Sequence, residues 1–247
     1  MSLHAATQQL IRQVEELSGK PVHVSEDPGL PTMAKMMPAR RGAPAHFVSY
    51  RPGTQSVDYL VAYQLTFLIR LYSCPEADRK EVTALAIEQQ RGIGEMGLAE
   101  APPDFADMMF SRIITQLRSY SVGMRVDQWL WNQVPELRQQ QEHSVRAQLK
   151  ENAQALTPEI RRQFPKRLVD TNTAMNAAYA YVWSVLLDDS RFAIPYKALG
   201  YESKANALLA TLREVPDAPL HDSTLIQRWA DLLGLVGCFH FSPLSPE

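Results

Sequence analysis

Residues 45–72 read AHFVSYRPGTQSVDYLVAYQLTFLIRLY, and this stretch decides the fold that we predict. Residues 46–50 alternate between apolar and polar side chains, which predicts a short strand, and the Arg-Pro-Gly at 51–53 predicts a turn after it. From about residue 56 to 72 the apolar side chains recur at helical spacing and form one stripe. We therefore expect a strand, a turn and an amphipathic helix in succession.

On the N-terminal side, residues 7–17 have an amphipathic helical pattern, and Gly19 follows them as a stop. Residues 21–25 alternate again. Two strands so close in sequence are expected to share a small antiparallel sheet. The segment 28–44 is rich in Pro, Gly and Met, which predicts a loop.

On the C-terminal side the helical period dominates. Helices are predicted from Pro75 to about Arg91, from Pro103 past Leu117, from Pro135 to about Leu156, in a short stretch capped by Thr157, and over 167–187, 202–212 and 224–233, the last capped by Ser223 and stopped by Gly234. The predicted fold is mainly α (α+β), with a small N-terminal antiparallel sheet and a C-terminal helical bundle. A boundary near 121–135 divides a strand-bearing part, 1–122, from a part with helices alone, 123–247; the alternative is one continuous domain.

Composition narrows the class of protein. Apolar residues make up 45% of the 247 residues, which is typical of a folded chain. With Lys+Arg 25 against Asp+Glu 27, the net charge of -2 gives no long-range attraction to nucleic acid or to an anionic membrane. Cys74 and Cys238 are predicted to be buried thiols in a reducing compartment. Neither a secretory signal nor a membrane span is expected, so we predict a cytoplasmic protein.

The helix predicted over 56–72 matches part of a known metal-binding sequence pattern, but the residues at the metal-binding positions of that pattern are replaced. The strand, turn and helix resemble the minimal zincin arrangement of the IrrE/ImmA-type metallopeptidases, whose helix has the form D-Y-L-x-A-H-E-x-x-H-x-x-R. Five residues match that frame as they stand here: Asp58, Tyr59, Leu60, Ala62 and Arg70. Tyr63 takes the place of the first His, Gln64 that of the catalytic Glu, and Phe67 that of the second His.

These three replacements remove the zinc chemistry. Two His at i and i+4 on one helix face chelate a single Zn²⁺, and the Glu between them accepts a proton from the bound water. A protonated phenol is a poor zinc ligand, and an amide carries no charge that accepts a proton. We expect no zinc chemistry, and we expect the aromatic i, i+4 pair Tyr63 and Phe67 to pack into the space of the former cleft.

A second stretch extends the resemblance. Residues 123–141 read GMRVDQWLWNQVPELRQQQ and are similar to a segment of uncharacterised zincin-like proteins, of the approximate form I-E-R-x-L-x-x-x-x-P-x-L-x-x-x-Q. The residues that match or nearly match are Asp127, Leu130, Pro135, Leu137 and Gln141. The resemblance makes Asp127 the counterpart of a third metal ligand. The alternative is an unrelated helical protein in which the D-Y-L-x-A match arose by chance.

Taken together, the resemblance and the lost ligands imply a non-catalytic pseudo-metallopeptidase scaffold without metal or cofactor. Such a scaffold would bind a protein or peptide partner, in an accessory or regulatory role of the kind found in bacterial stress, prophage or defence operons. The residues expected to line the relic cleft are Asp58, Tyr63, Gln64, Phe67 and Asp127. The alternatives are a hydrolase with an unrecognised site, for instance Asp127 with a distant His, and a nucleic-acid-binding regulator.

Two further patterns have simpler structural interpretations. Gly92, Gly94 and Gly97 spell G-x-G-x-x-G, but they follow a helical segment and not a strand, so we expect a helix end rather than a dinucleotide site. A basic cluster offers possible phosphate contacts, although a solvated helix end is the simpler interpretation. The cluster consists of Arg161, Arg162, Lys166 and Arg167.

The polar helix predicted over 135–156 has a narrow apolar line, which suits either an exposed surface helix or one side of a homodimer interface. Of the six histidines, only His46 lies near the suspected cleft. No two histidines have chelating spacing, so we assign no metal ligand.

Overall fold

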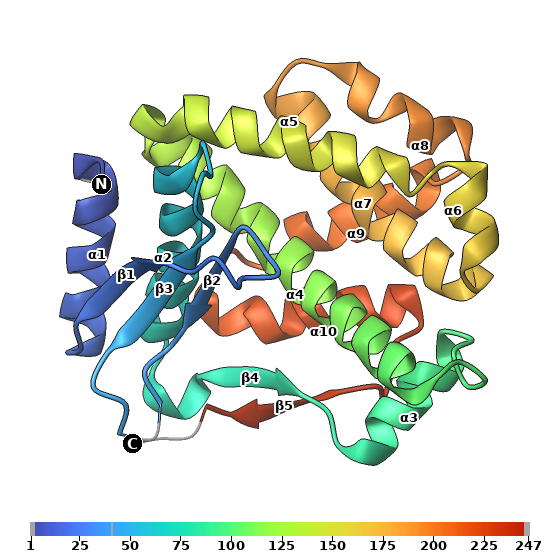
Figure 1. Ribbon diagram of the computed structural model, residues 1–247, viewed down its shortest axis with the longest axis horizontal. Helices are drawn as coiled ribbons and strands as arrows, with labels where there is room; N and C mark the ends of the chain where they lie inside the picture. Colours follow the sequence, from blue (N-terminus) through green and yellow to red (C-terminus); the bar gives the residue numbers. More distant parts are fainter. Residues whose placement is uncertain (1–2, 41, 245–247) are drawn as a thin grey trace. The chain divides into compact units, whose positions relative to one another are not determined.

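The computed structural model describes residues 3–40 and 42–244. It is mainly helical with a small sheet near the N-terminus, as the sequence predicts (Figure 1). The chain divides into two compact units, each treated by itself below. Of the described residues, the first unit takes those up to Arg79, Val126–Val145 and those from Pro243 onward. The second takes Lys80–Arg125 and Arg146–Ser242.

Two helices of the first unit confirm the periodicity argument. Helix α1 (Ala5–Ser18) buries Leu10 and Val14, and it ends at Gly19, whose positive φ of 71° suits a residue without a Cβ. Helix α2 (Val57–Ser73) buries the stripe expected from the sequence. In Figure 1, α1 lies beside α2, and α2 packs against one face of the sheet.

The sheet of the first unit is mixed, so the antiparallel prediction is wrong for its first pair. Strand β1 (Val22–Glu26) runs parallel to β3 (His46–Tyr50), and β2 (Ala34–Met37) pairs with β3 antiparallel, giving the order β1-β3-β2. Parallel neighbours need a long crossover, and the chain from 27 to 45 supplies one. This segment, predicted as a loop, contains β2, and its Ala34 and Met36 pack on the core.

The core of the first unit also draws on a distant part of the chain. Val48, Leu65 and Leu68 are fully buried in it, together with Val126 and Leu130 from the end of α4 (Pro103–Gln133). The predicted division at 122/123 therefore differs from the observed units. It falls inside α4, where Gly123 is one of a run of buried helical residues.

The second unit contains the remaining helices, whose beginnings mostly agree with the prediction. Their bounds are α3 (Ala86–Glu95), the first part of α4, the part of α5 (Arg138–Gln154) that follows Val145, α6 (Pro158–Gln163), α7 (Lys166–Leu186), α8 (Ile194–Ala198), α9 (Glu202–Glu214) and α10 (Asp222–Leu233). Short 3-10 turns cover Glu76–Asp78, Pro135–Leu137, Ser190–Phe192 and Pro219–His221. Thr157 Oγ1 accepts from the Ile160 N–H and Gly234 ends α10, as predicted, but α10 begins at Asp222, before the predicted cap Ser223.

A second, two-stranded sheet corrects two predictions. Strand β4 (Lys80–Thr83) pairs with β5 (His240–Pro243), so no single helix runs from Pro75 to Arg91, and helices do not stand alone after residue 135. The pairing partner lies at the far end of the sequence, and a local pattern carries no information about it. The link is reinforced by the His240 ring, whose Nδ1 lies 2.7 Å from Glu88 Oε2.

Over residues 3–40 and 42–244, no helix combines the length and the apolar character needed to cross a membrane. The apolar side chains of the polar segment 135–156 pack inside the chain itself, because Leu137, Val145 and Leu149 are buried. These side chains therefore offer little surface to a second copy, and the homodimer stays a prediction.

Candidate functional site

Tyr63, Gln64 and Phe67 lie in the middle of α2 and are half-buried. The rings of Tyr63 and Phe67 meet edge to face with centroids 5.2 Å apart. Both rings pack against the hydrophobic core of the first unit. One helical turn separates them, so the pair does what the sequence suggests for an aromatic i, i+4 couple: it fills space.

Asp58 is directed away from that aromatic pair. Its Oδ1 accepts from the His4 N–H at 2.6 Å and from Thr7 Oγ1 at 3.1 Å, and its Oδ2 accepts from Gln140 Nε2 at 3.3 Å. The carboxylate thus holds the first turn of α1 against α2. Nine residues at about 100° each place Asp58 and Phe67 on opposite faces of the helix.

Asp127 is also tied into the structure and not presented to a cleft. Its side chain is 2% exposed, and Oδ1 accepts from the Tyr59 hydroxyl at 2.7 Å. Gln141 Nε2 donates to the Asp127 backbone oxygen at 2.9 Å and to Oδ1 at 3.3 Å. Tyr59 comes from the first of the two stretches singled out in the sequence and Asp127 and Gln141 from the second, so the structure brings residues of both stretches together.

The five predicted cleft residues are therefore split. Tyr63, Gln64 and Phe67 share the middle of α2, whereas Asp58 faces α1 and Asp127 braces Tyr59. Tyr59 connects Asp127 to the aromatic pair: its hydroxyl donates to Asp127, and the centroid of its ring lies 6.1 Å from that of Tyr63.

His46 is a structural histidine with both ring nitrogens engaged. The Ala39 N–H donates to Nδ1 at 2.9 Å, and Nε2 lies 2.9 Å from Ser18 Oγ. Burial, with Lys20 as a further cause, lowers the pKa of the imidazole below its usual value. The ring is thus held neutral, with Nδ1 accepting and Nε2 donating.

Within the described part of the chain, no group of three or more His, Cys, Asp or Glu side chains is arranged to hold a metal ion. Cys74 and Cys238 are both buried, as predicted, and burial raises the pKa of Cys238.

The glycine pattern lies at a helix end. Gly92 and Gly94 belong to α3, and Gly97 follows with a positive φ of 74°. The Leu98 N–H closes the end by donating to the Ile93 carbonyl at 2.9 Å. The arrangement that a dinucleotide site requires, a strand before the glycines and a helix opening after them, is not the one formed here.

The basic cluster divides between two helices. Arg161 and Arg162 occupy the last turn of α6, and Lys166 and Arg167 the first turn of α7. Lys166 donates to Asp170, and Arg167 donates through Nη2 to the Leu233 carbonyl at the end of α10, at 2.6 Å.

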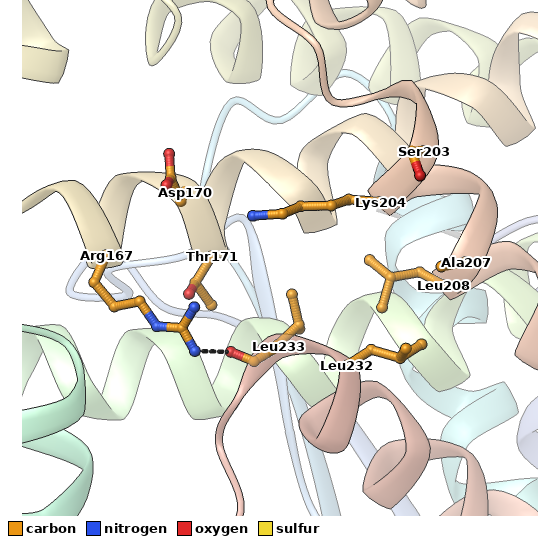
Figure 2. A pocket seen from close by; sticks show the side chains of 9 residues that line it. All are labelled: Arg167, Asp170, Thr171, Ser203, Lys204, Ala207, Leu208, Leu232 and Leu233. Atoms are coloured by element: carbon orange, nitrogen blue, oxygen red, sulfur yellow. Dashed lines mark hydrogen bonds between the residues drawn. The ribbon is translucent and has the colours of Figure 1, made fainter.

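A pocket of about 160 Å³ lies within the second unit, between α7, α9 and α10 (Figure 2). Arg167, Asp170 and Thr171 line it from α7, Ser203 and Lys204 from α9, and leucines complete the wall. Sequence reasoning singled out Arg167 alone, because Asp170 and Thr171 belong to no recognisable motif and Ser203 and Lys204 lie more than thirty residues further along the chain.

Comparisons with known proteins found no matching family model, no matching curated protein and no matching solved structure.

Proposed function

We propose that this chain is a non-catalytic scaffold of zincin-like ancestry that binds a protein or peptide partner. The observation that carries the proposal is the edge-to-face pair of Tyr63 and Phe67, which occupies the two zinc-ligand positions of the frame and packs on the core. An aromatic pair in that place supplies packing where the ancestral helix would supply ligands.

The state of Asp127 supports a scaffold over the alternative of a hydrolase. A carboxylate that activates water has to reach that water, whereas Asp127 is 2% exposed and accepts from Tyr59 and Gln141. Its contacts fix α4 and the start of α5 to α2, which is a structural task.

The outer face of the three-stranded sheet is the surface that we assign to the partner. Met37 and Phe47 are 51% and 38% exposed there, and Met33, which directly precedes β2, is 54% exposed. The register sets Met37 opposite Phe47 and Phe47 opposite His23, so the side chains form a row across the strands. Exposed apolar side chains beside the edge strand β2 suit an extended peptide that adds to the sheet.

The experiment uses the full chain and a random linear peptide library. Peptides selected on the wild type are expected to bind Met37→Lys at least about tenfold more weakly, because the substitution sets a charge in the apolar row. Val185→Lys is the matched control, since Val185 is an exposed apolar residue of the second unit. The proposal fails if no peptide is enriched, or if both variants lose affinity equally.

A further inference from the structure

The pocket between α7, α9 and α10 has a polar side and an apolar side. Arg167 and Thr171 from α7 face Lys204, which extends from α9 toward α7 (Figure 2). Leu208, Leu232 and Leu233 form the opposite wall. Amphipathic lining of this kind fits a ligand that has one polar end and one apolar end.

Thr171 indicates that the polar side is incomplete without a ligand. The residue is 2% exposed, and its hydroxyl has no hydrogen-bond partner among residues 3–40 and 42–244. A buried hydroxyl in that state is unfavourable, because it has lost its hydrogen bonds to water without gaining others. An acceptor atom placed in the pocket would remove this cost.

The charged side chains that line the pocket indicate the sign and magnitude of the charge that a ligand would carry. Arg167 uses one Nη2 donor on the Leu233 carbonyl and has further N–H groups. Asp170 is already engaged by the Tyr201 hydroxyl at 2.6 Å and by Lys166. The lining therefore holds the cations Arg167 and Lys204 against one carboxylate, an excess of one formal positive charge.

The volume limits the ligand to a small molecule. A cavity of about 150 Å³ admits benzene, and this pocket measures about 160 Å³. Three leucines on one wall favour a short branched or aromatic hydrocarbon group.

We propose that this pocket binds a small organic monocarboxylate with an apolar tail. The carboxylate lies between Arg167 and Lys204 and accepts from the Thr171 hydroxyl, and the tail rests on the leucines. A dianionic phosphate fits less well, because it would bring a second negative charge toward Asp170 and leave the leucine wall without a contact.

The test is calorimetric titration of the full-length protein with isovalerate, benzoate, isovaleramide and inorganic phosphate at low salt. Both carboxylates are expected to bind, and isovaleramide and phosphate are expected to bind at least about tenfold more weakly. Absence of binding by both carboxylates overturns the proposal. Equal affinity for isovalerate and its amide, or tighter binding of phosphate, overturns it as well.

Two variants locate the binding within the pocket. Thr171→Val should weaken isovalerate about tenfold while leaving the melting temperature of the free protein equal or higher, since an unpartnered hydroxyl becomes a methyl group. Thr173→Val is the matched control: Thr173 is 1% exposed on the same helix and does not line the pocket. Lys204→Gln should also weaken isovalerate about tenfold. Unchanged affinity of Lys204→Gln, or equal affinity of the two valine variants, contradicts the placement.

Discussion

At the scale of single residues, the acidic residues of the two stretches singled out in the sequence make structural contacts. Tyr59 and Asp127 come from the two matched stretches and form a buried hydrogen bond of 2.7 Å. Asp58, the first residue of the frame, fixes the start of α1. These carboxylates act on protein groups, and their partners explain why acidic residues tolerate burial here.

Tyr59→Phe is expected to lower the free energy of unfolding by about 1–3 kcal/mol, because Asp127 Oδ1 loses a donor inside the core. Asp127→Asn should cost less, since its amide oxygen can still accept from Tyr59. Urea unfolding of both variants measures the difference. An unchanged free energy of unfolding for Tyr59→Phe would show that the hydrogen bond from the Tyr59 hydroxyl to Asp127 adds nothing to stability.

The glycine pattern gives a second prediction at this scale. A Cβ on Gly92 would lie 2.1 Å from a ring carbon of the buried Phe110, so Gly92→Ala should lose about 1–3 kcal/mol of stability. Gly94→Ala is the matched control, because a Cβ there meets nothing within 4 Å, and the helix should gain about 0.5–1 kcal/mol. Urea unfolding measures the free energy of unfolding of both variants. If both substitutions changed it in the same direction, the close contact between Gly92 and Phe110 would be contradicted.

At the scale of elements, His46 joins three segments through one side chain. It belongs to β3, Ser18 ends α1, and Ala39 follows β2. Protonation of Nδ1 would set two donors facing each other at Ala39, so the network requires the neutral ring. The lowered pKa of His46 follows from the same burial that gives the network its strength.

This network makes stability depend on pH. The folded-state pKa of His46 lies below its ordinary value of 6.5, so the unfolded chain binds more protons between the two values. The stability contributed by the neutral ring is complete above 6.5 and is lost as the pH falls toward the folded-state pKa. Urea unfolding over that range should show this loss in the wild type and not in His46→Gln. Equal slopes in the two proteins would contradict the role of the ring.

At the scale of the whole molecule, the sequence predicts the helices well and the division of the chain poorly. The stripes of α1 and α2 and the stops at Gly19 and Gly234 are local signals, and each matches the structure. The parallel pairing of β1 with β3 and the pairing of β4 with β5 depend on partners distant in sequence, which no local period encodes.

For the candidate sites too, the sequence predicts what depends on local spacing and misses what depends on contacts between distant segments. The motif places Tyr63, Gln64 and Phe67 correctly on one helix, because i, i+4 spacing is a property of helices. It does not place Asp58 and Asp127 beside them, since the direction of each side chain depends on packing against α1, α4 and α5. The pocket at Thr171 and Lys204 is formed by tertiary structure alone.

Fragments test the division of the chain. Fragments 1–122 and 123–247 are each expected to lack a cooperative unfolding transition, whereas the full chain has one. The cut falls within α4 and removes four core residues from the first unit: Val126, Leu130, Val134 and Leu137. Circular dichroism during urea unfolding provides the readout. Cooperative unfolding of either fragment would support the boundary predicted from the sequence.

The most direct test of the central claim is the zinc content of the full-length protein after purification in the presence of zinc, measured by elemental analysis. We predict substoichiometric zinc in the wild type, because Tyr63 and Phe67 pack against the core and the amide of Gln64 carries no charge. In the same measurement, the combined substitution Tyr63→His, Gln64→Glu and Phe67→His should raise the zinc content if α2 retains the ancestral geometry. Stoichiometric zinc in the wild type would contradict the account and would point to a metal enzyme.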